Sequence, residues 1–116
     1  MYNSYITTCG DKIYQTNNNT KTVTCYTIKG EKLWEFKDES VLKDPRGLTV
    51  DNNSNVYVTS YSSNKVVVLE LDGRQGRQLI SSEDGLNGPI GLYFDKSKNC
   101  LLVTNYRGPA FLYHKC

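Results

Sequence analysis

The segment PRGLTVD occupies residues 45–51, and the segment PIGLYFD occupies residues 89–95. Both read Pro-x-Gly-Leu-x-apolar-Asp, and they lie 44 positions apart. Two further blocks keep nearly this offset: IYQT at residue 13 matches VYVT at residue 56, which in turn matches LLVT at residue 101. Matched blocks in one order at a nearly constant offset indicate an internal repeat of about 44 residues.

Each repeat unit reads as short strands separated by turns. In the middle unit the expected strands are 47–51, 56–60, 65–71 and 76–81, which are rich in Val, Tyr, Thr and Leu, and Asn, Asp, Ser and Gly fill the gaps. Four short strands in each unit are typical of a β-propeller blade, whose two faces are both buried against neighbours. The sequence therefore predicts an all-β fold, a β-propeller fragment in which helix is nearly absent.

The predicted blades cover about residues 4–40, 45–84 and 89–116, and the last one lacks its outer strand. The first strands are expected to start near Tyr5, Leu48 and Leu92. In the first unit SYITT replaces GLTVD, which aligns Ser4 with the glycine and Thr8 with the aspartate. Half a ring leaves blade faces open, so the chain is expected to self-associate or to pair with a longer propeller.

Composition narrows the possible partners and cofactors. The net charge of +2 in 116 residues gives no basic stripe for nucleic acid, and no apolar segment approaches the roughly 20 residues that cross a bilayer. With no secretory signal visible, the expected location is cytoplasmic.

The cysteines pair by spacing: Cys9 and Cys25 are 16 positions apart, and so are Cys100 and Cys116. This spacing would suit two disulfides. However, the four cysteines occupy different phases of the repeat, so reduced thiols are favoured.

Metal and cofactor chemistry is not expected. The chain has four cysteines without a Cys-x-x-Cys pair, and His114 is its single histidine. A zinc site needs about four such ligands at close spacing. No arrangement of Ser, Cys and His marks a nucleophilic enzyme. The chain is therefore expected to have no cofactor, no metal and no catalytic residues.

The repeat resembles the NHL repeat. The resemblance rests on Pro-x-Gly-apolar-x-apolar-Asp at 45–51, apolar-Tyr-Val-x-Ser at 56–60, Asn-Lys-apolar-x-Val at 64–68 and Asp72-Gly73. It covers nearly the whole chain and is strongest in the middle unit. NHL repeats usually build six-bladed propellers, so the resemblance implies the carboxy-terminal half of such a ring.

The chain is most similar to the propellers that end TRIM (tripartite-motif) proteins. That resemblance implies a non-catalytic module that recognises a protein or an RNA, single-stranded or structured, as the substrate-recognition part of a ubiquitin ligase whose RING is absent here. The alternative is a fragment of a six-bladed propeller enzyme, a metal-dependent lyase or a lactonase, and the single histidine argues against it.

Some repeat positions are expected to be structural. Asp51 and Asp95 share one phase, where a carboxylate accepts backbone N–H bonds after the first strand, and Gly47 and Gly91 permit a tight approach of the backbone. The other structural motif positions are Pro45, Asp72, Gly73 and Pro89.

The candidate binding residues lie in loops that are expected to emerge on one face. They are Arg46, Tyr61, Lys65, Tyr106 and Arg107. Aromatic and arginine side chains are enriched in recognition hot spots, and arginine suits carboxylate or phosphate groups. The alternative is that the tyrosines pack between blades and the arginines are solvated.

Overall fold

The computed structural model describes residues 4–70, 72–106 and 110–114 and shows three antiparallel sheets. The first sheet holds β1 (Ser4–Cys9), β2 (Lys12–Asn17), β3 (Thr22–Thr27) and β4 (Lys32–Phe36) in sequence order. The second holds β5 (Pro45–Val50), β6 (Val56–Ser60), β7 (Lys65–Glu70) and β8 (Gln75–Ile80). The third holds β9 (Pro89–Asp95), β10 (Cys100–Asn105) and β11 (Phe111–His114). In the described residues the one helical element is the 3₁₀ turn Ser82–Asp84.

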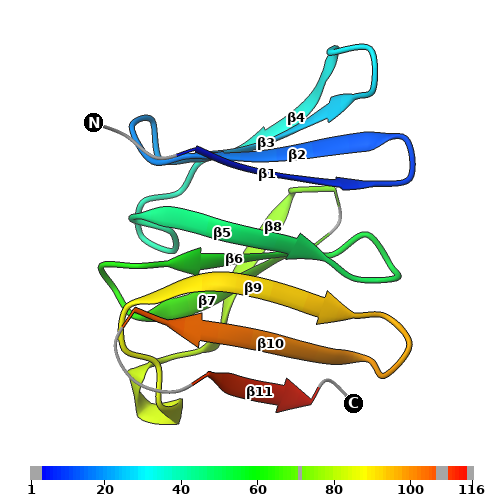
Figure 1. Ribbon diagram of the computed structural model, residues 1–116. Coiled ribbons are helices and arrows are strands. Elements are labelled where there is room, and N and C mark those ends of the chain that lie inside the picture. Colours follow the sequence, from blue (N-terminus) through cyan, green and yellow to red (C-terminus); the bar gives the residue numbers. More distant parts are fainter. Residues whose placement is uncertain (1–3, 71, 107–109, 115–116) are drawn as a thin grey trace.

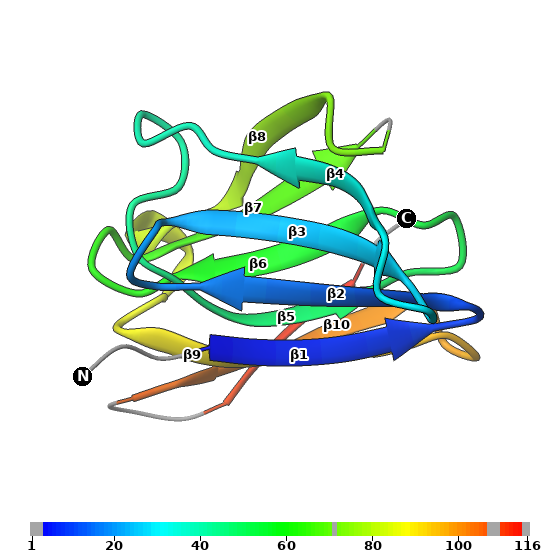
Figure 2. The ribbon, with the colours of Figure 1, turned by 90° about the horizontal axis from the view of Figure 1, so that it is seen from above.

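The three sheets stack face to face with their first strands side by side (Figures 1 and 2). β5 lies between β1 and β9 and contacts both of them. Each sheet is therefore a blade, and β1, β5 and β9 are the strands nearest the common axis. This arrangement confirms the predicted all-β propeller fragment, with three strands in the last blade.

Two apolar clusters bury the seams between blades. The seam between blades 1 and 2 joins Tyr14, Val23 and Phe36 to residues of β5, β6 and β7. The seam between blades 2 and 3 joins Tyr57 and other residues of blade 2 to blade 3, and the ring of Tyr57 stacks on that of Phe94 at 5.9 Å between centroids. Blade 2 supplies side chains to both seams, which explains why Val66–Leu69 are all at most 2% exposed.

Glycines of blade 2 make room for the aromatic residues of β4. A Cβ added at Gly73 would collide with the ring of Trp34, and one added at Gly76 would lie 2.6 Å from Phe36. Asp72 and Gly73 also both have positive φ, 56° and 81°, as a tight turn between β7 and β8 requires. The alternating strand KLWEF of blade 1 thus packs on a turn glycine and a strand glycine of its neighbour.

The pairing register corrects the alignment of the first unit by one residue. Thr8 pairs with Ile13 in blade 1, as Val50 pairs with Val56 in blade 2. Because Ile13 and Val56 are repeat mates, Cys9 and not Thr8 stands at the position of Asp51. By the same register Tyr5, and not Ser4, stands at the position of Gly47. The sequence alignment was wrong here because the β1–β2 turn is shorter than the β5–β6 turn.

Candidate functional site

The predicted binding loops lie at one end of the sheets. Pro45 and Pro89 begin β5 and β9 at this end, where proline is tolerated as a first strand residue. The loops that follow β2, β6 and β10 reach the same end because neighbouring strands are antiparallel. We call this end the proline face.

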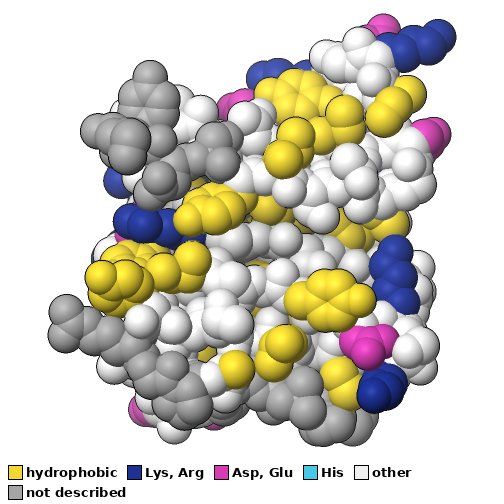
Figure 3. All heavy atoms as spheres, in the orientation of Figure 1, with side chains coloured by type: hydrophobic (Ala, Val, Ile, Leu, Met, Phe, Trp, Pro, Cys, Tyr) yellow, Lys and Arg dark blue, Asp and Glu magenta, His cyan; other side chains and the backbone are white. Residues whose placement is uncertain are grey.

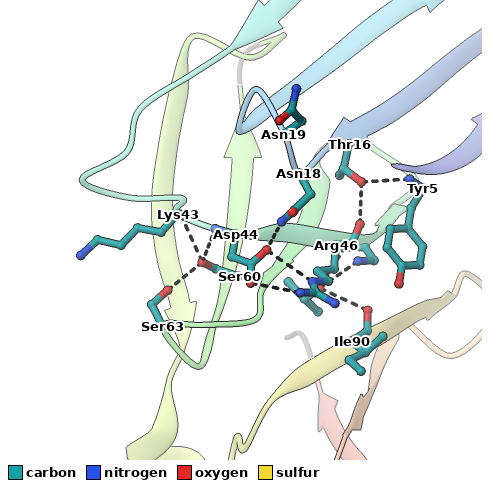
Figure 4. Close-up of polar contacts among 12 residues, drawn as sticks. Tyr5, Thr16, Asn18, Asn19, Lys43, Asp44, Arg46, Ser60, Ser63 and Ile90 are labelled. Carbon is teal, nitrogen blue, oxygen red and sulfur yellow. Dashed lines mark hydrogen bonds and ion pairs between the residues drawn. The ribbon is translucent and has the colours of Figure 1, made fainter. Parts of the chain in front are cut away.

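Arg46 is held within the proline face rather than exposed to solvent (Figure 4). Its Nε lies 3.3 Å from Oδ1 of Asp44, its guanidinium carbon lies 4.4 Å from the ring centre of Tyr61, and its side chain is only 23% exposed. The Asp44 carboxylate also accepts a hydrogen bond from Nδ2 of Asn18. The backbone carbonyl of Arg46 accepts one from Oγ1 of Thr16 at 2.7 Å. Arg46 thus belongs to the seam between blades 1 and 2.

Tyr61 and Tyr106 meet over a glycine at the next seam. Their ring centroids are 6.2 Å apart at 81°, an edge-to-face arrangement. A Cβ added at Gly88 would lie 3.0 Å from the Tyr61 ring and 3.2 Å from Cβ of Tyr106. The Gly88 N–H donates to Oδ1 of Asn64 at 2.7 Å, and its carbonyl accepts from the Tyr106 N–H at 2.6 Å. Tyr61 is half-buried, and Tyr106 is 62% exposed.

The structure therefore brings Arg46, Tyr61 and Tyr106 into one cluster, the Arg–Tyr–Tyr cluster. Lys65 begins β7, half-buried and paired with Ser60, and none of the ring contacts described above includes it. Arg107 lies outside the described residues. The alternative is correct for Tyr61, which packs between blades 2 and 3 against Gly88, and wrong for Arg46, whose guanidinium contacts Asp44 and Tyr61.

Sequence reasoning missed the residues that position this cluster. Asp44 and Gly88 each directly precede the proline of the repeat motif, one in each seam. Their shared position before the motif proline could have marked them as seam residues, although one is an aspartate and the other a glycine. Asn18 carried no motif signal, and Asn64 belongs to the Asn-Lys motif of the repeat but gave no sign of its partner, because Asp44 and Gly88 lie 26 and 24 residues away in the chain.

The two aspartates of the motif differ in environment. Asp51 is 3% exposed and accepts from the N–H groups of Asn53 and Asn55 and from the hydroxyl of Tyr57 at 2.8 Å. Burial alone would raise the pKa of Asp51, but these hydrogen bonds outweigh it, and the net pKa lies below the ordinary value of 3.8. Burial and the bond to Asp51 raise the pKa of Tyr57. Among the described residues, Asp95 accepts hydrogen bonds from its own turn alone, from Ser97 and from the Lys98 N–H.

The two motif glycines are crowded in different ways. A Cβ on Gly47 would collide with the backbone carbonyl of Ile90 in the next blade. A Cβ on Gly91 would instead meet the hydroxyl of Thr104 in its own blade. Gly47 thus lets β5 and β9 approach each other, which is the close backbone approach expected of a strand glycine.

The opposite end holds a shallow hollow of about 500 Å³ on the axial side of β1, β5 and β9. Threonines line it with Tyr93 and Lys96, and Nζ of Lys96 lies 3.3 Å from Sγ of Cys9.

Within the described part of the chain, no three His, Cys, Asp or Glu side chains gather as a metal site would require. None of the three described cysteines forms a disulfide with another. Among the described residues, no helix is long and apolar enough to cross a membrane.

Comparison with known proteins supports the fold. A family described as a beta-propeller repeat (SBBP) matches residues 39–65, less than half of the chain. No curated protein sequence matches the chain. The family match names a propeller repeat, so the NHL type stays a prediction.

Solved structures with similar folds include enzymes and a protein complex. A catalytically inactive virginiamycin B lyase from Staphylococcus aureus with quinupristin matches at TM-score 0.64 and 17% identity, covering 95% of this chain and 40% of the other. A chain in a nidogen/laminin complex matches at TM-score 0.69 and 21% identity, covering 83% and 36%. A luciferin-regenerating enzyme matches at 0.66 and 18%, covering 90% and 37%. At these identities the likeness shows the fold alone, and the chain spans about 40% of the lyase chain's length.

Proposed function

We propose that this propeller fragment is a non-catalytic binding module that engages a partner protein through the Arg–Tyr–Tyr cluster. The observation that carries the proposal is the pre-ordered ring pair: Tyr61 is fixed between Arg46 and Gly88, and Tyr106 presents 62% of its surface beside it. Rigid aromatic side chains supply contact area at low entropic cost. The similar fold in a nidogen/laminin complex supports a protein partner.

A protein partner is favoured over RNA by the charge of the site. Phosphate recognition depends on cations that are free to neutralise phosphates. Here Asp44 already compensates the guanidinium of Arg46 at 3.3 Å. We infer that the site binds an apolar or aromatic peptide segment rather than a nucleic-acid backbone. The TRIM-type ubiquitin pathway and a cytoplasmic location are further proposals, supported by the resemblance of the repeats.

Parallel selections from a random displayed-peptide library and a random RNA pool test this proposal. We expect peptides to be enriched and RNA not. Tyr106→Ser should abolish capture of the enriched peptides, whereas the matched control Tyr93→Ser, an equally exposed tyrosine at the axial hollow, should retain it. Enrichment of RNA alone, or loss of capture in Tyr93→Ser only, would contradict the proposal.

Arg46→Ala is not a clean test of binding. Removing the guanidinium leaves the Asp44 carboxylate, 15% exposed, without its ion-pair partner. Because the Arg46 and Asp44 side chains are both largely buried, we expect this variant to lose folding stability. A fall in both melting temperature and capture would thus be uninformative for this variant.

An enzyme fragment is the second candidate function. The support is the hollow beside the axial strands together with the lyase and luciferin-regenerating neighbours. The direct test is turnover of quinupristin, the compound bound in the lyase structure, by this chain followed by mass spectrometry. We expect no turnover; a product whose formation stops in Lys96→Ala would favour the enzyme.

A further inference from the structure

The loop before β9 contains the dipeptide Asn87–Gly88, placed directly beneath the Tyr61–Tyr106 ring pair. Asn87 is exposed, and Gly88 has a φ of 64°. Asparagine followed by glycine is the pair in which the backbone nitrogen most readily reaches the preceding side chain, because glycine has no Cβ to obstruct the approach. Asparagine is also among the thermolabile residues of proteins.

Four hydrogen bonds hold this loop against blades 2 and 3. Asn64 Oδ1 accepts from the Gly88 N–H at 2.7 Å, and the Tyr106 N–H donates to the Gly88 carbonyl at 2.6 Å. Asn105 Oδ1 accepts from the Asn87 N–H at 3.0 Å, and its Nδ2 donates to the Gly85 carbonyl at 3.4 Å. The Gly88 nitrogen, the atom that would attack the side chain of Asn87, is thus engaged by the side chain of Asn64 from the neighbouring blade.

We propose that Asn87 is a site of spontaneous conversion to aspartate and isoaspartate, and that Asn64 sets its rate by holding the Gly88 N–H. The Gly88 nitrogen attacks Cγ of Asn87, the N–Cγ bond forms, the Cγ–Nδ2 bond breaks, and ammonia leaves with the proton from the glycine nitrogen. Water then opens the five-membered imide at either carbonyl. The reaction needs no other reactant.

The product disrupts the seam between blades 2 and 3. Isoaspartate inserts a methylene into the backbone directly before Gly88. That residue contacts both tyrosine rings and makes two of the four hydrogen bonds. An added backbone atom displaces these contacts, and the new carboxylate adds a negative charge beside the rings. Conversion at Asn87 therefore loosens the Arg–Tyr–Tyr cluster with time.

The variants Asn64→Gly and Asn64→Asp separate the role of the acceptor from that of the backbone. Asn64 has a φ of 53°, which glycine and aspartate both tolerate. Asn64→Gly removes the acceptor of the Gly88 N–H, whereas Asn64→Asp keeps one. We expect conversion at Asn87 to be several-fold faster in Asn64→Gly and close to wild type in Asn64→Asp.

Peptide mapping by mass spectrometry during incubation at mildly alkaline pH measures the conversion, with an isoaspartate-specific methylation assay as a second readout. Asn53, followed by Ser54 in an exposed turn, is the internal reference in each sample. A rise at Asn87 relative to Asn53 in Asn64→Gly supports the proposal. Equal acceleration at both sites, which reports unfolding, or no product at Asn87 in the wild type, overturns it.

Discussion

Asp51 and Asp95 occupy the same position of the repeat, and among the described side chains Asp51 alone of the two accepts a hydrogen bond from a tyrosine. The repeat mate of Tyr57 in blade 3 is Leu102, which has no hydroxyl to donate. The bond from Tyr57 to Asp51 at 2.8 Å therefore exists in blade 2 and has no counterpart in blade 3. Asp51 and Asp95 therefore share a repeat position but are expected to stabilise the fold to different extents.

The pH dependence of folding follows from this difference. The pKa of Asp51 is lowered in the folded chain, so its carboxylate contributes stability above the ordinary pKa of 3.8. That contribution is lost as the pH falls through the folded pKa. We expect Asp51→Asn to reduce the unfolding free energy by about 1–3 kcal/mol near neutral pH and to flatten its acid dependence. Denaturant melts from pH 7 to pH 3 measure both effects.

Asp95→Asn is the matched control for that experiment. Its carboxylate bonds only within the turn after β9, so the neutral-pH stability should change less than in Asp51→Asn. Equal losses in the two variants would show that the Tyr57 bond contributes nothing measurable.

At the scale of the elements, each seam is closed in the same way. The loop before the first strand of one blade contacts the residue that follows the second strand of the preceding blade. Asn18 and Tyr61 share that phase; Asn18 bonds Asp44, and Tyr61 lies on Gly88. Tyr106 has the same phase in blade 3, so a following blade would contact it with its own loop. If Tyr106→Ser changed self-association instead of peptide capture, Tyr106 would belong to a seam and not to a binding site.

The close approach of β5 and β9 gives the sharpest test of packing between these elements. Gly47→Ala places a methyl group against the backbone carbonyl of Ile90, which cannot rotate away. We expect a loss of about 1–3 kcal/mol in unfolding free energy, as for other overpacked sites. Gly91→Ala should cost less, because the Thr104 side chain it meets can rotate. Urea melts of both variants measure the difference, and equal costs would contradict the close approach.

The sequence predicted the elements well because the repeat was visible twice. Matched blocks around Pro45 and Pro89 carried the strand positions and the proline face. The register of β1 was missed because the shorter turn at Gly10 shifts Cys9 onto the phase of Asp51, and no residue type marks that shift. The Arg46–Asp44 pair was missed as well, since both residues have side chains that are usually solvated.

At the scale of the molecule, blades 1 and 3 present exposed apolar side chains. Ile6, Ile28 and Leu33 of blade 1 are 67%, 62% and 50% exposed. Tyr93 and Leu102 of blade 3, which pair across β9 and β10, are 62% and 36% exposed. Apolar side chains gather over blade 1 in the space-filling view (Figure 3).

We expect the exposed apolar side chains of blades 1 and 3 to make the isolated chain self-associate. Replacing Ile6, Ile28 and Leu33 together with threonine keeps β-propensity and removes apolar surface, so association should weaken. Three threonines at the exposed polar positions Glu39, Lys43 and Ser62 are the control and should change nothing. Light scattering over a concentration series measures this, and a wild-type chain that stays monomeric throughout would contradict the expectation.

The repeats of this chain form blades that stack face to face around one axis. Nuclear Overhauser contacts between blades test this arrangement most directly, because strand content alone does not report stacking. Stacked blades predict cross-peaks between the rings of Tyr57 and Phe94 across blades 2 and 3, and between the Trp34 ring and Gly73 across blades 1 and 2. Intact contacts within each sheet without the Tyr57–Phe94 cross-peaks would contradict the stacking.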